Sequence, residues 1–247
     1  ASSGSGGCSY DRYSPRLRDE TRCRWGVLST ANSGRTRFIP ALQSMPSVEV
    51  VAVASRNLQA AEVFAQECGI PRAYGSYQEL LEQPDIDILY NPTPNHLHVP
   101  LSIQALEYGK HVLCEKPIAL TTGELEQLVQ AQQQYPLARV MEGFMYRFHP
   151  QWRYICALIR DQIIGEVTHV HSIFTYFNDD PQNVRNQDDL GGGGLLDIGC
   201  YCVDVAKMIF NGNPKSAQSH IDYDSNFGTD RLTTGLLEFE RGTATLV

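Results

Sequence analysis

The chain has 247 residues, 42% of them hydrophobic and 19% charged, with a formal net charge of −8 at pH 7. This composition is that of a globular protein with one large or two medium cores. The acidic balance excludes nucleic acid or an anionic membrane as a partner held by charge, because both attract basic surfaces. No apolar run approaches the roughly 20 residues that a bilayer requires, and no charged start leads into an apolar signal segment. We therefore expect a cytoplasmic protein that acts on a small molecule.

The seven cysteines support the same location. They are odd in number and scattered through apolar segments, which is typical of reduced, buried thiols. Cys200-x-Cys202 lacks the second pair that a zinc site needs, and we expect no metal.

Residues 1–24 are rich in Ser, Gly and charge without periodicity, which predicts a flexible leader. A short apolar strand, Trp25–Leu28, then leads through a turn of small residues into a helix over Arg35–Met45. In such a unit the free backbone N–H groups at the helix start can meet an anion, so the turn is a candidate phosphate site. Its candidate cofactor-binding residues are Ser29, Thr30, Ala31, Asn32 and Ser33.

This turn departs from the dinucleotide fingerprint G-x-G-x-x-G. Ser29 and Ala31 stand at the first two glycine positions, and only Gly34 is retained. Small side chains still let the backbone approach a pyrophosphate. A plain tight turn without a ligand is the alternative interpretation.

Strands alternate with helices up to about residue 142. Apolar runs predict strands over Val48–Ala54, Ile86–Tyr90, His111–Cys114 and Ala138–Glu142. Helical spacing and cap residues predict helices over Leu58–Cys68, Tyr77–Glu82, His98–Tyr108 and Thr122–Gln134. This alternation is typical of an α/β fold with a doubly wound parallel sheet. We expect a Rossmann-type NAD(P)-binding domain over residues 25–142.

The end of the second strand discriminates between cofactors. Folds that select NAD place Asp or Glu there to hold the ribose hydroxyls, whereas this chain has Ser55-Arg56. A hydroxyl and a guanidinium suit a 2′-phosphate, because Arg offers a planar fork of donors. We expect NADP, with NAD less favoured. A solvated surface arginine is the alternative.

Lys116 follows the buried strand His111–Cys114 and precedes Pro117. In open α/β sheets ligands lie at the carboxyl ends of the strands, so a lysine held there by a stiff proline can point into a cleft. A surface lysine near a turn is the alternative. The loop Asn91–Asn95, which two prolines stiffen, ends at the same edge.

The pattern changes after residue 142. Helices are predicted over Trp152–Arg160 and, after the glycine run Gly191–Gly194, over Leu195–Phe210. Strands are predicted over Val167–Phe177, Ser216–Tyr223, Arg231–Glu240 and Gly242–Val247. These elements indicate an α+β domain over residues 143–247 with a mainly antiparallel sheet. Because no element closes the last strand, we expect a C-terminally truncated fragment.

Three motifs together resemble a known family. They are Pro94-Asn95-x-x-His98, Glu115-Lys116-Pro117 and Gly192-Gly193-Gly194-Leu195-Leu196-Asp197-Ile198-Gly199-x-Tyr201. With the strand–turn–helix start, they resemble the glucose-fructose oxidoreductase/inositol dehydrogenase (Gfo/Idh/MocA) family. The likeness runs from about Arg24 to Val247 and is greatest to the branch of dihydrodiol dehydrogenases, D-xylose dehydrogenases and sugar ketoreductases. The glycine-poor first turn is the main departure.

The resemblance implies a catalytic set of Lys116, Asp197 and Tyr201. Hydride transfer to a carbonyl builds negative charge on oxygen, so the reaction needs a cation and a proton donor. Lys116 is expected to supply the charge and to lower the pKa of the Tyr201 phenol, the acid in reduction and the base in oxidation. Asp197, one helical turn earlier, is expected to bind the substrate. The alternatives are a helix-start charge for Asp197 and a core aromatic for Tyr201.

The resemblance assigns further residues around this set. It implies a cis peptide bond before Pro117, which would aim the lysine. For His98, a satisfied helix-start histidine is the alternative, and for Glu115 a scaffold role. The implied cofactor-binding residues are Pro92, Thr93, Asn95, His98, Glu115 and Lys116, and the implied substrate-binding residues are Tyr146, Arg147, Asp197 and Tyr201.

We expect an NADP-dependent oxidoreductase that transfers hydride between the nicotinamide and a secondary alcohol or carbonyl of a sugar, sugar derivative or cyclic diol. A catalytically inactive NAD(P)-binding regulator and an NAD-dependent glycosidase of the same fold are the alternatives. The resemblance also implies a homo-oligomer, a dimer or tetramer, in the full-length form.

Overall fold

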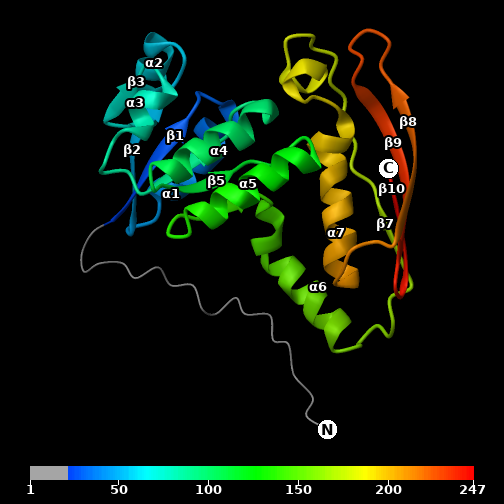
Figure 1. Cartoon of the computed structure of the whole chain (residues 1–247). Coiled ribbons are helices and arrows are strands. Elements are labelled where there is room, and N and C mark those ends of the chain that lie inside the picture. The colour runs from blue at the N-terminus through cyan, green and yellow to red at the C-terminus, as the bar shows by residue number, and fades with distance from the viewer. Residues whose placement is uncertain (1–21) are drawn as a thin grey trace. The chain divides into compact units, whose positions relative to one another are not determined.

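The computed structural model describes residues 22–247. The chain divides into two compact units, residues 1–88 and residues 89–247, and Figure 1 traces their elements. Of the leader predicted over residues 1–24, residues 1–21 lie outside the described residues. Its last two positions belong to the first strand, β1 (Cys23–Leu28), which begins two residues before the predicted Trp25.

The first unit is built on strands with consecutive buried side chains. β2 (Val48–Ala54) is buried from its third residue onward, and it pairs in parallel with β1 and with β3 (Arg72–Tyr74). The helices that follow these strands are a π-helix (Gly34–Phe38), α1 (Ile39–Gln43), α2 (Leu58–Cys68) and α3 (Tyr77–Leu81). α2 ends as predicted at Gly69, which takes the left-handed conformation at φ 64° that favours glycine.

The first sheet contains six strands in the order β3-β2-β1-β4-β5-β6. Its other strands are β4 (Ile88–Asn91), β5 (His111–Cys114) and β6 (Val140–Glu142). This strand order is that of doubly wound dinucleotide-binding folds, so the predicted α/β architecture is confirmed. The sequence did not predict β3, because three half-buried residues make no apolar run.

Within the second unit, helices cover the strands that carry the candidate residues. α4 (His98–Glu107) and α5 (Thr122–Gln134) pack together through Val99, Leu106 and Leu128. The Thr121 side chain caps α5 by accepting a bond from the Glu124 N–H, as its residue type favours. α6 (Pro150–Arg160) follows β6.

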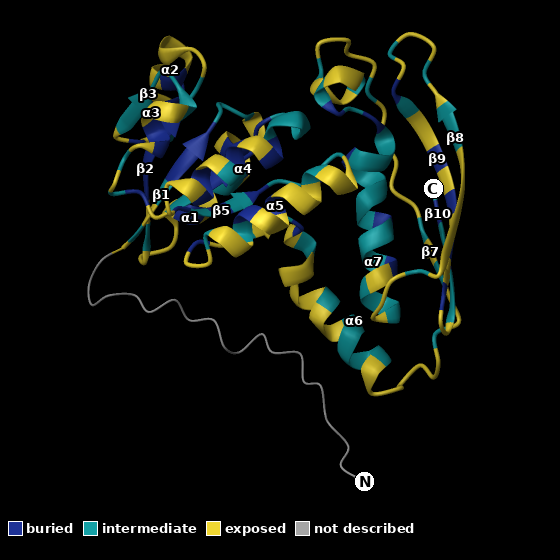
Figure 2. Cartoon of the chain, in the orientation of Figure 1, coloured by how far each residue is buried: buried dark blue, intermediate teal, exposed yellow. Residues whose placement is uncertain are grey.

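The second sheet has the order β7-β10-β9-β8. Its strands are β7 (His169–Ser172), β8 (Ser216–Tyr223), β9 (Asp230–Phe239) and β10 (Gly242–Leu246). β9 pairs antiparallel with both neighbours, whereas β7 and β10 are parallel, so the sheet is mixed and mainly antiparallel. Figure 2 shows that the edge strand β8 is largely exposed.

α7 (Cys200–Phe210) lies on one face of this second sheet (Figure 1). Cys202 and Ala206 of the helix pack against Leu237, Phe239 and Leu246 of the strands. The aromatic rings of Phe210 and Phe239 stack with centroids 4.6 Å apart. The helix that carries Tyr201 therefore packs on the hydrophobic core of the second sheet.

Apart from shifts of one or two residues at element ends, three predicted elements differ from the structure. The helix expected over Arg35–Met45 is a π-helix, Gly34–Phe38, followed by the short α1. The strand expected over Val167–Phe177 is shorter and is limited to β7. Phe174 still donates its N–H to Val247 O at 3.0 Å, and the irregular segment beyond it brings the side chain of Tyr176 to Asp197. The helix expected over Leu195–Phe210 begins as a π-helix, Leu195–Gly199. Such turns recur at functional sites, and this one holds Asp197.

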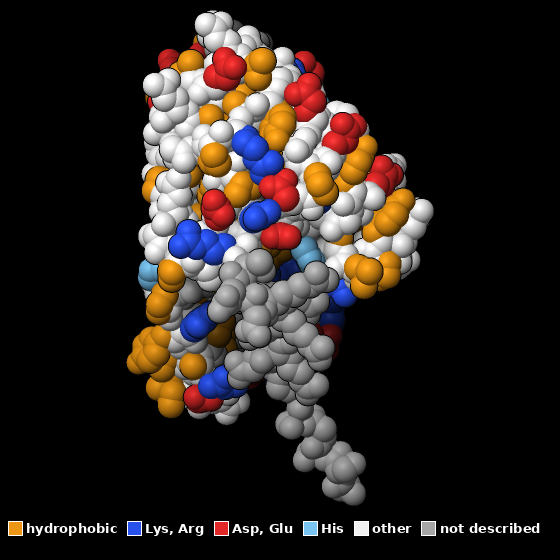
Figure 3. Space-filling view, turned by 90° about the vertical axis from the view of Figure 1, so that its left-hand side faces the viewer, with side chains coloured by type: hydrophobic (Ala, Val, Ile, Leu, Met, Phe, Trp, Pro, Cys, Tyr) orange, Lys and Arg blue, Asp and Glu red, His pale blue; other side chains and the backbone are white. Residues whose placement is uncertain are grey.

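The described residues carry charges of both signs. Figure 3 shows acidic and basic side chains intermixed over one face, with apolar side chains among them. Within the described part of the chain, no helix combines the length and apolar character needed to cross a membrane.

Replacing Phe239 by Ala will lower the free energy of unfolding by about 3–5 kcal/mol, because the ring is 4% exposed and stacks on α7, and truncation leaves a cavity. Urea denaturation followed by circular dichroism measures the loss. Leu236→Ala is the matched control on the same strand, since Leu236 is 40% exposed. Equal losses in the two variants would show that α7 does not depend on this core.

Candidate functional site

Lys116 lies just beyond β5 and reaches the start of the helix that leads into α7. Its Nζ donates to the Asp197 backbone carbonyl and to Asp197 Oδ1, the latter at 2.9 Å. Both side chains are 11% exposed. The Lys116–Pro117 peptide bond is cis, as expected. The structure therefore brings these two residues of the implied catalytic set into contact.

Asp197 is held by three cationic or hydroxyl donors. Its Oδ2 accepts bonds from the Tyr176 hydroxyl at 2.8 Å and from Arg185 Nε at 2.7 Å. Burial pushes the pKa of this carboxyl upward, but the charge and hydrogen bond of Lys116, with Arg185, outweigh it and hold the pKa below its usual range. Asp197 is therefore a carboxylate at neutral pH.

Tyr201 stands one helical turn after Asp197 and presents the face of its ring to Lys116. Lys116 Nζ lies 5.3 Å from the ring centroid, and Phe144 and Phe174 pack against the ring with centroids 5.3 and 5.7 Å away. Burial, with the Glu115 charge, raises the pKa of Tyr201 to about 12. The predicted lowering of this pKa by Lys116 is therefore wrong, because the ammonium meets the ring and burial disfavours the phenolate.

The glycine run positions the start of this helix. Gly193 adopts φ 113°, and a Cβ built there would lie 2.0 Å from Asp230 Oδ1. Asp230 Oδ2 in turn accepts a 2.6 Å hydrogen bond from the N–H of Leu195, which is the first residue of the π-helix. Glycine at this position therefore lets Asp230 hold the helix start.

Tyr146 and Arg147, predicted to face the substrate, both bind Asp204 on α7. The Tyr146 hydroxyl donates to Asp204 Oδ2, and Arg147 donates from Nε to Oδ2 at 2.7 Å and from Nη2 to Oδ1. The Tyr146 ring also contacts the ring of Tyr201, with centroids 5.8 Å apart. The structure thus places Tyr146 beside Tyr201, and Asp204 engages the polar groups of both Tyr146 and Arg147.

The loop Asn91–Asn95, which follows β4, is connected to the segment around Lys116 by the buried imidazole of His98. His98 is 1% exposed, and its Nδ1 and Nε2 lie 2.7 Å from Pro117 O and 2.8 Å from Thr93 O. Asn95 donates from Nδ2 to the Gly191 carbonyl at 2.8 Å. Pro92 precedes Thr93 in this loop. The loop therefore connects the lysine strand to the glycine run.

Glu115 precedes the lysine and is anchored on both sides. Its N–H donates to Asn91 O at 3.0 Å, and its Oε1 accepts a 2.7 Å bond from the Tyr90 hydroxyl. Since β4 and β5 neighbour each other, the anchoring fixes the segment from which Lys116 projects.

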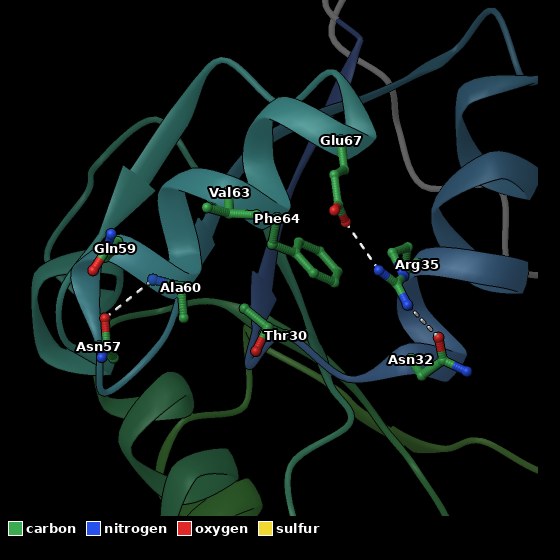
Figure 4. Close-up of a pocket in the computed structure, with 9 residues that line it drawn as sticks. All are labelled: Thr30, Asn32, Arg35, Asn57, Gln59, Ala60, Val63, Phe64 and Glu67. Atoms are coloured by element: carbon green, nitrogen blue, oxygen red, sulfur yellow. Dashed lines mark hydrogen bonds and ion pairs between the residues drawn. The ribbon is translucent and has the colours of Figure 1, made fainter.

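The first unit contains the predicted phosphate turn. Ser29 adopts φ 76°, and its N–H donates to Ala54 O at 2.8 Å. Thr30 and Asn32 line a cavity of about 450 Å³ (Figure 4). Ala31 and Ser33 flank Asn32 in the same turn.

The predicted pair at the end of β2 lies beside this cavity but does not line it. Ser55 Oγ accepts a bond from the Asn57 N–H at 3.3 Å, and Arg56 is exposed. Asn57 and Gln59, the next residues of this segment, do line the cavity.

Sequence reasoning missed four charged or hydroxyl side chains. Tyr176 and Arg185 bind Asp197 from an irregular segment, and Arg35 and Glu67 line the cavity of the first unit. Arg35 stands next to the phosphate turn, which was the signal available for it.

The described residues include no cluster of three or more His, Cys, Asp or Glu side chains arranged to hold a metal ion. The arrangement of Lys116, Asp197 and Tyr201 instead offers a buried cation, a carboxylate that holds it and a protonated phenol. This combination can stabilise negative charge on a carbonyl oxygen and deliver a proton to it.

Comparisons with known proteins agree with these observations. Residues 23–144 match the model of an oxidoreductase family with an NAD-binding Rossmann fold, and residues 152–247 match that of the GFO/IDH/MocA C-terminal domain. An uncharacterized oxidoreductase of Rhizobium meliloti is 44% identical over 91% of this chain and 67% of its own. A trans-1,2-dihydrobenzene-1,2-diol dehydrogenase of Xenopus laevis is 38% identical over 87% of this chain and 65% of its own.

A solved structure is also similar. It is that of a 3-ketoreductase from Actinomadura kijaniata in complex with NADP and TDP-benzene, which is 32% identical at a TM-score of 0.83 and covers 92% of this chain and 69% of its own. The chain thus spans about two thirds of the length of these proteins. Because the models of both its N-terminal and its C-terminal domain match, the chain belongs to the GFO/IDH/MocA family of oxidoreductases.

Proposed function

We propose that the chain is an NADP-dependent oxidoreductase that transfers hydride between the nicotinamide and a secondary alcohol or carbonyl of a sugar, sugar derivative or cyclic diol. The observation that carries this proposal is the buried pair of Lys116 and Asp197 beneath the ring of Tyr201. A fold that only bound the cofactor would not need a buried lysine, a charged aspartate and a tyrosine in mutual contact. The inactive regulator is therefore the weaker proposal.

The residues of the first unit fit a phosphorylated dinucleotide. The turn at Ser29 keeps a left-handed backbone, and the end of β2 offers Ser55 and Arg56 with no acidic residue at the two positions. Donors of this kind suit a 2′-phosphate. The similar 3-ketoreductase was solved with NADP, which supports NADP over NAD and makes the NAD-dependent glycosidase the least supported alternative.

When bound, the nicotinamide supplies or accepts the hydride at the substrate carbon. In reduction, Tyr201 gives its phenolic proton to the carbonyl oxygen as that oxygen becomes an alcohol. Lys116 provides positive charge close by, which stabilises the oxygen as charge develops. In oxidation, Tyr201 takes the proton back.

Asp197 keeps Lys116 in place and can also meet the substrate. A carboxylate has about four acceptor positions, and three donors to this one are Lys116, Tyr176 and Arg185. One position on Oδ1 is therefore open to a substrate hydroxyl. Two adjacent hydroxyls, as in a sugar or a diol, would meet Tyr201 and Asp197 together.

For the cofactor, we assign the adenosine and phosphates to the turn at Ser29–Ser33 and to Ser55 and Arg56. The nicotinamide half is assigned to Glu115, Lys116 and the loop residues Pro92, Thr93 and Asn95. His98 is 1% exposed and both of its ring nitrogens lie against backbone carbonyls, so its part in cofactor binding is to hold this loop in place, as expected of a satisfied helix-start histidine. Tyr146 remains assigned to the substrate side through its contact with Tyr201, and Arg147 through Asp204, which binds both residues.

Further aspects of the proposal concern the whole protein. The functional domains are residues 25–142 and 143–247, and the protein is a dimer or tetramer in its full-length form. The described cysteines are all free, which supports a reducing compartment, the cytoplasm.

Replacing Lys116 by Ala will lower kcat/KM by about a hundredfold to a thousandfold, because the oxygen loses its stabilising charge. The measurement is NADPH oxidation at 340 nm with a panel of ketoses, ketone derivatives of sugars and cyclic diketones. Lys207→Ala is the control, since Lys207 is an exposed lysine near the end of α7. Full activity in Lys116→Ala would overturn the mechanism.

The pH dependence of the two directions will differ. A phenol with a pKa of about 12 is protonated at neutral pH, so carbonyl reduction stays flat from about pH 6 to about pH 9. Alcohol oxidation needs the phenolate and rises about tenfold per pH unit over that range. Initial rates in both directions test this, with Tyr201→Phe as the variant that loses the rise. An oxidation rate that levels off near pH 7 would contradict the assignment.

Titration of the chain with NADPH and NADH, followed by nicotinamide fluorescence, will show tighter binding of NADPH. Arg56→Gln will weaken NADPH binding by about tenfold or more and leave NADH binding unchanged, because only NADPH carries the 2′-phosphate that a charged donor would meet. If the chain binds neither nucleotide, the proposed function fails.

A further inference from the structure

The cavity of the first unit contains a cation that is already engaged by a carboxylate. Thr30 and Asn32 line it from the phosphate turn, and Asn57 and Gln59 line it from the start of α2 (Figure 4). Arg35 also lines it, from the π-helix that follows the turn. A cation at this place adjoins the segment where the chain meets phosphates in the proposed function.

The Arg35 guanidinium has two partners. Its Nη1 donates to Glu67 Oε2 at 2.9 Å, and its Nη2 donates to Asn32 Oδ1 at 2.9 Å. In Figure 4 the three side chains lie along one side of the cavity, with Glu67 reaching in from α2. The Arg35 and Glu67 side chains are each 47% exposed. An ion pair this exposed is weak, because water and salt screen it.

A phosphate monoester is a stronger partner for a guanidinium than a single carboxylate. It carries up to two negative charges and three acceptor oxygens, and arginine can bind it with two parallel N–H donors. The exchange costs little when the pair that must open is exposed. The cavity also offers the Asn57 and Gln59 amides to the same anion.

We propose that Arg35 is a cation for the 2′-phosphate of the dinucleotide and that Glu67 competes with this phosphate for it. The inference rests on the proposed function and adds to it a residue pair that sets the preference for NADP over NAD. A nucleotide with a free 2′-hydroxyl offers no anion that could replace the Glu67 carboxylate, so the ion pair of Arg35 and Glu67 stays closed. Glu67 therefore weakens phosphate binding, and its removal strengthens it.

The test uses calorimetric titration of the whole chain with adenosine 2′,5′-bisphosphate and with 5′-AMP, which lacks the 2′-phosphate. Arg35→Gln lowers the affinity for the bisphosphate by about tenfold or more, the effect of losing one charge-assisted donor, and leaves the affinity for 5′-AMP unchanged. Arg37→Gln is the matched control. Arg37 is an exposed arginine of the same π-helix and is not among the residues that line the cavity.

The second variant has the opposite sign. Glu67→Gln raises the affinity for the bisphosphate by about twofold to fivefold, the range set by an exposed ion pair. In the double variant with Arg35→Gln this gain disappears, because the competition acts only through Arg35. A merely structural role of the pair would change the affinity for 5′-AMP as well.

The outcomes separate this inference from the proposed function. Preference for the bisphosphate in the wild-type chain, unchanged by Arg35→Gln, overturns the inference and leaves the proposed function standing. A Glu67→Gln variant that binds the bisphosphate no more tightly overturns the competition. Binding of neither nucleotide by the wild-type chain overturns both proposals.

Discussion

The ion pair between Lys116 and Asp197 is the contact on which the candidate site depends. It joins residues 81 positions apart in the chain, one just beyond β5 and the other in the π-helix before α7. Both side chains are 11% exposed, and charges so shielded from water are tolerated only when they are paired. Because each needs the other, the two segments keep one arrangement, and Tyr201 is set one turn later with its ring over the ammonium.

The same pair explains why the surrounding polar groups are so fully engaged. Asp197 is also bound by Tyr176 and Arg185, so the negative charge is shared among three donors and the carboxyl stays ionised. Burial acts on Tyr201 in the opposite sense and keeps its proton in place. One environment therefore holds a charged carboxylate and a neutral phenol a helical turn apart, which is how a site assigns different roles to titratable neighbours.

The sequence predicts what depends on local rules. Gly69, Ser76 and Thr121 mark helix ends where backbone conformation and capping decide. Lys116 lies just beyond β5, at the sheet edge that the buried run before Pro117 predicts, whereas its contact with Asp197 depends on a segment far along the chain. Tyr176 and Arg185 were missed because they lie on an irregular segment, whose path is set by Asp197 and not by periodicity. The pKa of Tyr201 was predicted in the wrong direction, since it depends on burial and on which face of the ring meets the lysine.

The glycine-poor turn after β1 keeps a glycine-like backbone conformation although it lacks the glycines of the fingerprint. A residue with a side chain pays about 1–2 kcal/mol in the left-handed region, yet Ser29 adopts φ 76° and donates its N–H to Ala54 O at 2.8 Å. The β1–β2 pairing holds the backbone there, so the turn keeps the conformation that glycine would favour. Replacing the glycines therefore fills space beside the turn with side-chain atoms but leaves the backbone conformation unchanged. The selectivity for phosphates that we propose therefore depends on side chains such as Arg35, which line the adjoining cavity.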